Sequence, residues 1–213
     1  GGPRAHGFDR FLGISASLDM PPYVWLRDDR VTAAPAGRVG DSPAPRLWRA
    51  GPIGADFKME DVQPRLTAET LAFLGERAAA RDGRPFFVMV SLASPHTPTL
   101  ATGEFAGSTP TPYGDFVRQV DADFGRILAE LDRLGLARNT LVVFTPDNGY
   151  APAGDIPSHR ALGHDSSGGF RGAKSDSYEG GHRVPFLARW PGVTPPGGRS
   201  GAVIGHLDLF ATL

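Results

Sequence analysis

Two stretches of the chain carry apolar residues at helical spacing. The first begins at Thr67 and ends at the Asp82-Gly83 pair, and the second spans 116–134 and is followed by Gly135, a residue type that commonly ends helices. The second stretch repeats its apolar residues at i, i+4, i+8 and i+11, which predicts one long helix with a single buried face. These apolar positions are Phe116, Val120, Phe124, Ile127, Leu128, Leu131 and Leu134.

Three short apolar runs predict β-strands, at 86–92, 140–145 and 184–190. The first two are apolar on both faces, as expected for strands in a sheet that is covered on both sides. The order helix, strand, helix, strand is typical of an α/β fold. We therefore predict an α/β domain with a mostly parallel central sheet and helices on both faces, and no long element in residues 1–60.

Composition and charge narrow the class of protein. The 213 residues include no cysteine, which excludes disulfides and thiolate metal sites, and the net charge of −1 argues against a nucleic-acid binder. No apolar run approaches the roughly 20 residues of a transmembrane segment. The chain begins with glycine and ends inside an apolar run, so we expect a fold truncated at both ends, and the sequence leaves the cellular location open.

Polar clusters follow the predicted strands, in loops that hold many of the 28 glycines and 20 prolines. They lie at 94–98 (Ser-Pro-His-Thr-Pro), 146–149 (Pro-Asp-Asn-Gly) and 169–174 (Gly-Phe-Arg-Gly-Ala-Lys). In open α/β sheets, ligands bind just beyond the carboxyl ends of the strands. These clusters are therefore the candidate functional loops.

Asp147 and Asn148 are adjacent oxygen donors just beyond a predicted strand. On a regular strand they would point to opposite faces, but Pro146 and Gly149 allow the backbone to turn so that both converge. One carboxylate and one amide oxygen suit a hard cation such as Ca²⁺ or Mg²⁺. Asn-Gly is also a common turn signal, so the residues alone leave a metal-ligand pair and a simple turn as alternatives.

Two further side chains carry candidate chemistry. His96 lies between two prolines and has the chemistry to donate a proton to a leaving oxygen. Lys174 follows a glycine-rich loop and suits sulfate or phosphate oxygens, although the Gly-Ala-Lys order differs from a P-loop. Taken singly, both are equally compatible with solvated loop residues. His159, His164 and His182 are spaced too irregularly to indicate a zinc site.

Taken together and in this order, the clusters resemble the sulfatase family of the alkaline-phosphatase-like superfamily. The resemblance spans almost the whole chain, although residues 21–60 match poorly. The Tyr-Glu-Gly-Gly-x-Arg-x-Pro block at 178–185 is its most specific part. The other matching stretches are 7–11, 13–14, 19–20, 94–98, 145–149, 170–174, 189–192 and 206–209.

The resemblance implies hydrolysis of sulfate esters, either small molecules or sulfated glycans. It implies that Asp147 and Asn148 are two ligands of a divalent cation, usually Ca²⁺, with Mg²⁺ as the alternative. It also implies that His96 contacts the ester oxygen and helps to protonate the leaving group, and that Lys174 binds the sulfate. Ser17 is similar to the family's auxiliary sulfate-binding serine.

Several family motifs are absent from this sequence. Family members carry an upstream Asp-Asp pair, a Cys- or Ser-x-Pro-x-Arg motif whose first residue becomes the formylglycine nucleophile, and a Lys-x-His pair. The doublet at 28–29 is misplaced, and the run at 42–46 has Ala44 where the motif needs proline. We therefore expect residues 1–213 to be the middle and later part of a sulfatase catalytic domain, inactive alone, with the missing parts preceding Gly1.

Three alternatives remain from the sequence. A phosphoester or phosphonate-ester hydrolase of the same superfamily would present similar groups to a tetrahedral oxyanion. A non-catalytic binding protein would keep the scaffold and lack the nucleophile. At the sulfate site itself, Ser15 is the neighbouring alternative to Ser17.

Overall fold

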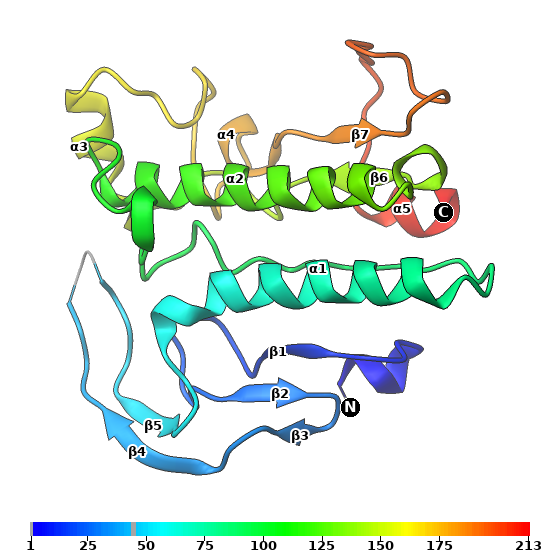
Figure 1. Ribbon diagram of the computed structural model, residues 1–213. Coiled ribbons are helices and arrows are strands. Elements are labelled where there is room, and N and C mark those ends of the chain that lie inside the picture. Colours follow the sequence, from blue (N-terminus) through cyan, green and yellow to red (C-terminus); the bar gives the residue numbers. More distant parts are fainter. Residues whose placement is uncertain (1, 44–45) are drawn as a thin grey trace.

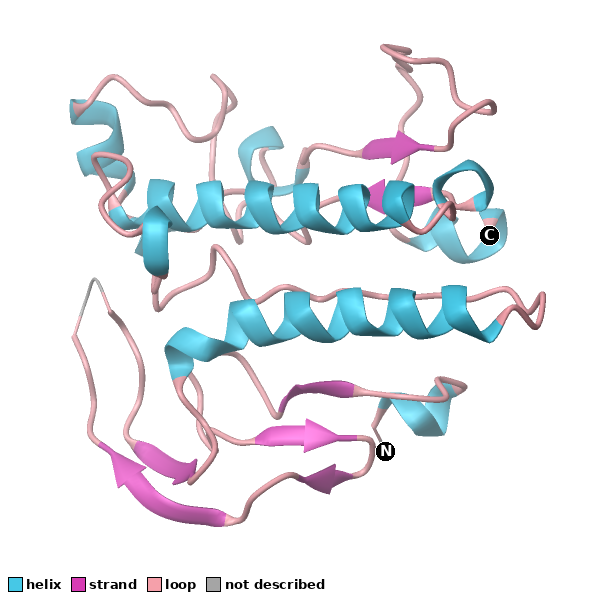
Figure 2. Ribbon diagram, viewed as in Figure 1, coloured by secondary structure: helices cyan, strands magenta, loops and turns pink. Residues whose placement is uncertain are grey.

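The computed structural model describes residues 2–43 and 46–213, so Ala44 and Pro45 of the 42–46 run lie outside the described residues. Helices α1 (Val62–Ala80) and α2 (Pro112–Arg133) pack side by side through the middle of the molecule (Figure 1). Figure 2 shows two small sheets on the α1 side and a third on the α2 side. The strands are β1 (Leu12–Ile14), β2 (Trp25–Arg27), β3 (Arg30–Val31), β4 (Pro35–Val39), β5 (Gly51–Gly54), β6 (Val142–Phe144) and β7 (Leu187–Arg189).

Short helices punctuate the loops between these elements. None of the helices among the described residues is both long enough and apolar enough to cross a membrane. The short α-helices are α3 (Ile156–Ala161), α4 (Glu179–His182) and α5 (Leu207–Thr212), and the 3₁₀ helices are η1 (Pro3–His6), η2 (Met59–Asp61), η3 (Gly103–Phe105), η4 (Ala137–Asn139) and η5 (Pro152–Gly154).

Helix α2 confirms the long amphipathic helix predicted from the sequence. It begins after Thr111, whose hydroxyl accepts a hydrogen bond from the Gly114 N–H at 3.1 Å, and Pro112 occupies the first turn, where no donor is needed. It ends before Gly135, which has a φ of 71° that favours glycine. Helix α1 begins five residues before the predicted Thr67, because a proline in the first turn, here Pro64, does not interrupt a helix.

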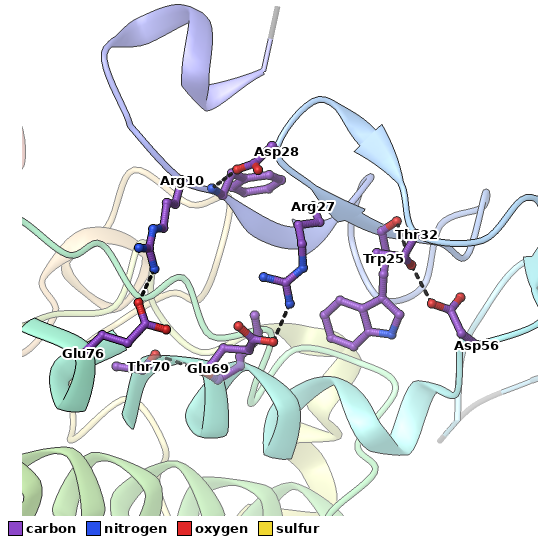
Figure 3. Close-up of polar contacts among 11 residues, drawn as sticks. Arg10, Trp25, Arg27, Asp28, Thr32, Asp56, Glu69, Thr70 and Glu76 are labelled. Carbon is purple, nitrogen blue, oxygen red and sulfur yellow. Dashed lines mark hydrogen bonds and ion pairs between the residues drawn. The ribbon is translucent and has the colours of Figure 1, made fainter. Parts of the chain in front are cut away.

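Residues 1–60 contain more regular structure than predicted. Strands β1, β2 and β3 form an antiparallel sheet, and β4 pairs antiparallel with β5. Figure 3 shows Arg10 and Arg27 reaching from this region to Glu76 and Glu69 of α1, while the Arg65 guanidinium lies 4.4 Å from the centre of the Trp25 ring. The buried cluster between this region and α1 comprises Leu18, Tyr23, Trp25, Phe57, Met59, Val62 and Leu100.

Strand pairing differs from the expected mostly parallel sheet. Strands β6 and β7 lie within two of the predicted strands, but they pair antiparallel. The run at 86–92 is extended without a hydrogen-bonded neighbour in the described part of the chain, and its exposure alternates, with Phe87 65% and Met89 69% exposed. An apolar run specifies which side chains avoid water, whereas a strand also needs a pairing partner, which the run itself does not specify.

A buried polar network joins both long helices to the loop that carries His96. The Gln63 amide nitrogen donates to the Asp123 carboxylate at 2.9 Å, and its amide oxygen accepts from the Ser94 hydroxyl at 2.9 Å. Arg126 pairs with the same Asp123 at 3.1 Å. Gln63 and Asp123 are 2% and 1% exposed, so their polar atoms depend on these partners.

Replacing Gln63 by alanine should lower the free energy of unfolding by about 2–3 kcal/mol, because it leaves a buried carboxylate and a buried hydroxyl each short of one partner. Urea unfolding would measure the loss. Glu69→Ala on the same helix is the matched control, since its exposed pair with Arg27 should contribute less than about 1 kcal/mol. Equal losses in the two variants would contradict a structural role for the buried network.

Candidate functional site

Asp147 and Asn148 lie three and four residues after Phe144, the last residue of β6. The Asn148 amide nitrogen donates to the Gly149 carbonyl at 3.0 Å, which leaves the amide oxygen as the atom able to bind a ligand. The Asp147 side chain is exposed and forms no ion pair within residues 2–43 and 46–213. Both oxygen donors are therefore available to a cation.

Three loops that lie far apart in the sequence are joined by backbone hydrogen bonds at this place. The Gly149 N–H donates to the Gly181 carbonyl at 2.9 Å, and the Gly180 N–H donates to the Arg171 carbonyl at 2.8 Å. The Lys174 N–H donates to the Tyr150 carbonyl at 2.9 Å. The backbone of Lys174 is thus held against the chain two residues beyond Asn148.

Glycine is required where these loops touch. A Cβ atom at Gly149 would collide with the carbonyl oxygen of Gly180, and one at Gly180 would collide with the carbonyl oxygen of Gly172. A Cβ at Gly181 would meet the carbonyl oxygen of Asp176. The Gly-Gly pair of the 178–185 block lets three backbone segments approach more closely than any residue with a Cβ would allow.

The loop around Lys174 is braced from both sides. The Ala173 N–H donates to the Asp176 carboxylate at 2.8 Å, which turns the chain just before the Lys174 side chain, itself half-buried. Arg183 pairs with Glu179 at 2.8 Å and lies over the Phe170 ring at 4.7 Å. These contacts restrict the loop.

An aromatic cluster anchors the 150–173 loop to the start of α2. The Tyr150 hydroxyl donates to the Gly154 carbonyl and lies 3.1 Å from Nδ1 of His159, and the Tyr113 ring packs edge-on against Tyr150 at 4.5 Å. Burial raises the pKa of Tyr150 to about 12. Burial, with the nearby His164, lowers the pKa of His159, which favours the neutral imidazole.

This cluster was missed at the sequence level. Its histidines were set aside as irregularly spaced, and no group of three or more His, Asp or Glu side chains suited to a metal ion occurs in the described part of the chain. The residue that could have pointed to this cluster in the sequence is Tyr150, which directly follows the 146–149 cluster. Aromatic packing of this kind has no fixed sequence spacing.

His96 sits in a tight turn beside the buried network. Its N–H donates to the Ala93 carbonyl at 3.1 Å, and its Nδ1 lies 2.6 Å from the Thr97 carbonyl. A carbonyl oxygen only accepts, so Nδ1 carries the hydrogen and Nε2 is the ring atom left for a ligand. The preceding Ser94 hydroxyl is bonded to Gln63, which fixes the start of the turn.

Ser17 lies in the turn after β1, where its carbonyl accepts from the Met20 N–H at 2.9 Å. Two residues later, Asp19 is 6% exposed; one of its oxygens lies 4.0 Å from Arg49 and the other is buried without a partner among the described residues. One backbone hydrogen bond holds Lys174 against Tyr150, two residues after Asn148. Within the described residues, no hydrogen bond or ion pair links His96 or Ser17 to that pair.

Comparison with known proteins places the chain in a family. The family model described as Sulfatase matches residues 1–213. Steryl-sulfatase of Rattus norvegicus is 36% identical over 207 residues, which cover 93% of this chain and 35% of that protein. Arylsulfatase A of Bos taurus is 34% identical over 218 residues, covering 99% of this chain and 40% of that protein. The chain therefore spans less than half the length of these relatives.

Solved structures agree with this result. One, described under the metabolism of multiple glycosaminoglycans by Bacteroides thetaiotaomicron, matches with a TM-score of 0.73 at 28% identity, covering 89% of this chain and 47% of that chain. A second, in complex with k-i-k-neocarrahexaose, shares the fold with a TM-score of 0.71 at 21% identity, covering 99% of this chain and 46% of that chain. They confirm the predicted α/β, alkaline-phosphatase-like fold class, and with the family match they show that the chain belongs to the sulfatase family.

Proposed function

We propose that the protein containing this chain hydrolyses sulfate esters at the site formed by the 147–150, 171–174 and 178–183 loops. The observation that carries this proposal is the backbone bonding of Gly149 to Gly181 and of Tyr150 to Lys174. It supports an ammonium group and two cation-binding oxygens acting on one small oxyanion, the combination that a sulfate group needs.

The donor atoms at 147–148 fit a divalent cation. The Asn148 amide oxygen is free because its nitrogen is engaged, and the Asp147 carboxylate is exposed. Two hard oxygen donors suit Ca²⁺, with Mg²⁺ as the alternative, and the further ligands are expected from the upstream Asp pair of the family. The bound cation would supply positive charge for the sulfate oxygens, and the formylglycine expected upstream would supply the attacking oxygen.

Lys174 and His96 have complementary roles in this proposal. Lys174 binds a sulfate oxygen and neutralises charge on the transferring group, while its loop is held rigid by the Asp176 and Arg183 contacts. His96 presents Nε2 to the ester oxygen, since Nδ1 is engaged by the Thr97 carbonyl. When Nε2 of His96 is protonated, it donates this proton to the oxygen of the departing alcohol as the S–O bond breaks.

Ser17 is proposed to bind a further sulfate oxygen through its hydroxyl, which makes no hydrogen bond within residues 2–43 and 46–213. The substrate is proposed to be a sulfated small molecule or a sulfated glycan, because the relatives include a steryl-sulfatase of Rattus norvegicus and an N-acetylgalactosamine-6-O-sulfatase of Bacteroides thetaiotaomicron.

Gly180→Ala in the full-length protein tests the loop arrangement. It should lower kcat/KM for 4-nitrophenyl sulfate by about tenfold to a hundredfold, because the added methyl group drives the 171–174 loop away from Asn148. Gly75→Ala in α1 is the matched control, since its Cβ meets no atom within 4 Å, and it should keep full activity. Full activity in Gly180→Ala, or turnover of 4-nitrophenyl phosphate in place of the sulfate, would contradict the proposed function.

Asp147→Ala in the full-length protein should remove the bound divalent cation and lower kcat by about 10²- to 10³-fold. The reason is that the carboxylate ligand is lost, and with it the positive charge of the cation. Elemental analysis would measure the metal content, and a sulfatase assay would measure the rate. Asp121→Ala, which changes an exposed carboxylate of α2, is the control. A variant that keeps both metal and activity would remove Asp147 from the metal site.

His96→Ala should affect substrates according to their leaving groups. For an alkyl or sugar sulfate, kcat/KM should fall by about 10²- to 10⁴-fold, because the departing alkoxide needs a proton. For 4-nitrophenyl sulfate, whose phenolate is stable without one, the loss should stay below about tenfold. The comparison of both rate constants in wild type and variant measures this, and an equal loss for the two substrates would argue against an acid role.

A further inference from the structure

Residues 150–174 form a loop whose two ends are bonded to each other. The carbonyl of Tyr150, the first residue, accepts the N–H of Lys174, the last, at 2.9 Å. Near the second end, the Ser167 hydroxyl donates to the Gly172 carbonyl at 3.2 Å. The backbone position of Lys174 therefore depends on how the inside of this loop is packed.

The imidazole of His159 lies inside the loop and contacts both of its arms. This residue of α3 is almost completely buried. Its Nδ1 atom lies 3.1 Å from the hydroxyl oxygen of Tyr150 in the first arm, and 3.1 Å from the hydroxyl oxygen of Ser166 in the second. Its ring also stacks on the Tyr150 ring, with the two centroids 5.4 Å apart. One side chain thus joins the residue that holds Lys174 to the arm that leads to it.

The hydrogen bonds of Tyr150 determine which nitrogen of His159 carries a proton. A carbonyl oxygen only accepts, so the Tyr150 hydroxyl directs its single hydrogen to Gly154. The hydroxyl oxygen is then left to accept from Nδ1–H of His159, which makes Nε2 the unprotonated atom of the neutral ring. Acidification therefore adds a proton at Nε2 and places a full positive charge inside the loop.

The surroundings of His159 disfavour this charge. The titratable groups around the ring are Tyr150, Tyr113 at the start of α2 with its ring centre 5.4 Å away, His164 with its ring centre 5.8 Å away, and Asp155 at the start of α3. Burial raises the pKa of both tyrosines, so they stay neutral. Burial, with His164, also lowers the pKa of His159, and the Asp155 carboxylate opposes this only in part.

The effect of pH follows from the direction of this shift. The pKa of His159 is lower in the closed loop than the ordinary value of about 6.5, so opening of the loop takes up a proton as the pH falls. The stabilisation of the closed loop by neutral His159 is fully present above about pH 6.5 and is lost as the pH falls through the lower pKa of the folded state. The closed loop is therefore favoured near neutral pH.

We propose that neutral His159 positions Lys174 against the sulfate, and that protonation of His159 opens the loop and weakens sulfate binding. Only Tyr150 stands between the two residues, because its hydroxyl contacts His159 and its carbonyl holds the Lys174 backbone. A shift of about 1 Å in a positioned group costs up to about a hundredfold in rate. The inference rests on the proposed function, since it uses Lys174 as the sulfate ligand.

The test uses the full-length protein with two substitutions of His159. His159→Asn keeps an amide nitrogen as a donor for Tyr150 but takes up no proton, whereas His159→Leu removes the donor. At pH 7.5, His159→Leu should weaken the binding of inorganic sulfate, measured by calorimetry, by about tenfold, and His159→Asn by less than about threefold. Amide hydrogen exchange of residues 171–178, measured by mass spectrometry, should become about tenfold faster in His159→Leu.

A change of pH separates this role from general stabilisation. Between pH 7.5 and pH 5.5, the dissociation constant for sulfate should rise about threefold or more in the wild type relative to His159→Asn. Protonation of His96 affects both proteins alike and cancels in this ratio. His6→Asn, which removes an exposed histidine of η1 outside the loop, is the matched control and should follow the wild type.

The outcomes separate the two proposals. Unchanged exchange of residues 171–178 in His159→Leu, or the same pH dependence in the wild type and His159→Asn, would overturn the role of His159. If His159→Leu does not fold, the pH comparison with His159→Asn decides alone. Wild-type protein that hydrolyses no sulfate ester would overturn the proposed function. The exchange measurement needs no ligand, so it would still decide whether His159 holds the Lys174 loop.

Discussion

The buried amide of Gln63 is the contact on which the placement of the His96 turn depends. It donates to Asp123 of α2 and accepts from Ser94 at the start of the His96 turn, so one side chain satisfies polar groups of three separate segments. A buried polar group without its partner costs about 1–3 kcal/mol, and a charged one more. The two helices therefore pack in the register that keeps all three groups bonded, and that register sets where the His96 turn leaves the core.

The glycine-linked loops of the candidate site are held together in a different way. Here the loops at 147–150, 171–174 and 178–183 contact one another through backbone atoms, and Gly149 and Gly180 allow an approach that any Cβ would prevent. Because backbone groups have fixed geometry, this arrangement holds Lys174 near Asn148 without the rotamer freedom of long side chains. The aromatic contacts of Tyr150 with His159 and Tyr113 then tie these loops to α2.

The two parts of the candidate site are proposed to contact different parts of a sulfate ester. The glycine-linked loops carry the groups proposed to act on the sulfate, which is common to every sulfate ester. The His96 turn carries the group proposed to protonate the leaving alcohol, which differs from one sulfate ester to another.

The sequence by itself determined the family and the long helix α2, and it supplied the residues that are proposed to act on the sulfate ester. Helical spacing marks a buried face directly, and ordered motifs such as the 178–185 block identify a family even when each motif alone is ambiguous. It also indicated that residues 86–92 avoid water, but not how they pair. The tertiary structure alone decided the bonding of Lys174 to Tyr150 and the anchoring of Ser94 by Gln63. The physical reason is that every residue carries the same backbone donors and acceptors, so which distant groups meet depends on how the whole chain packs.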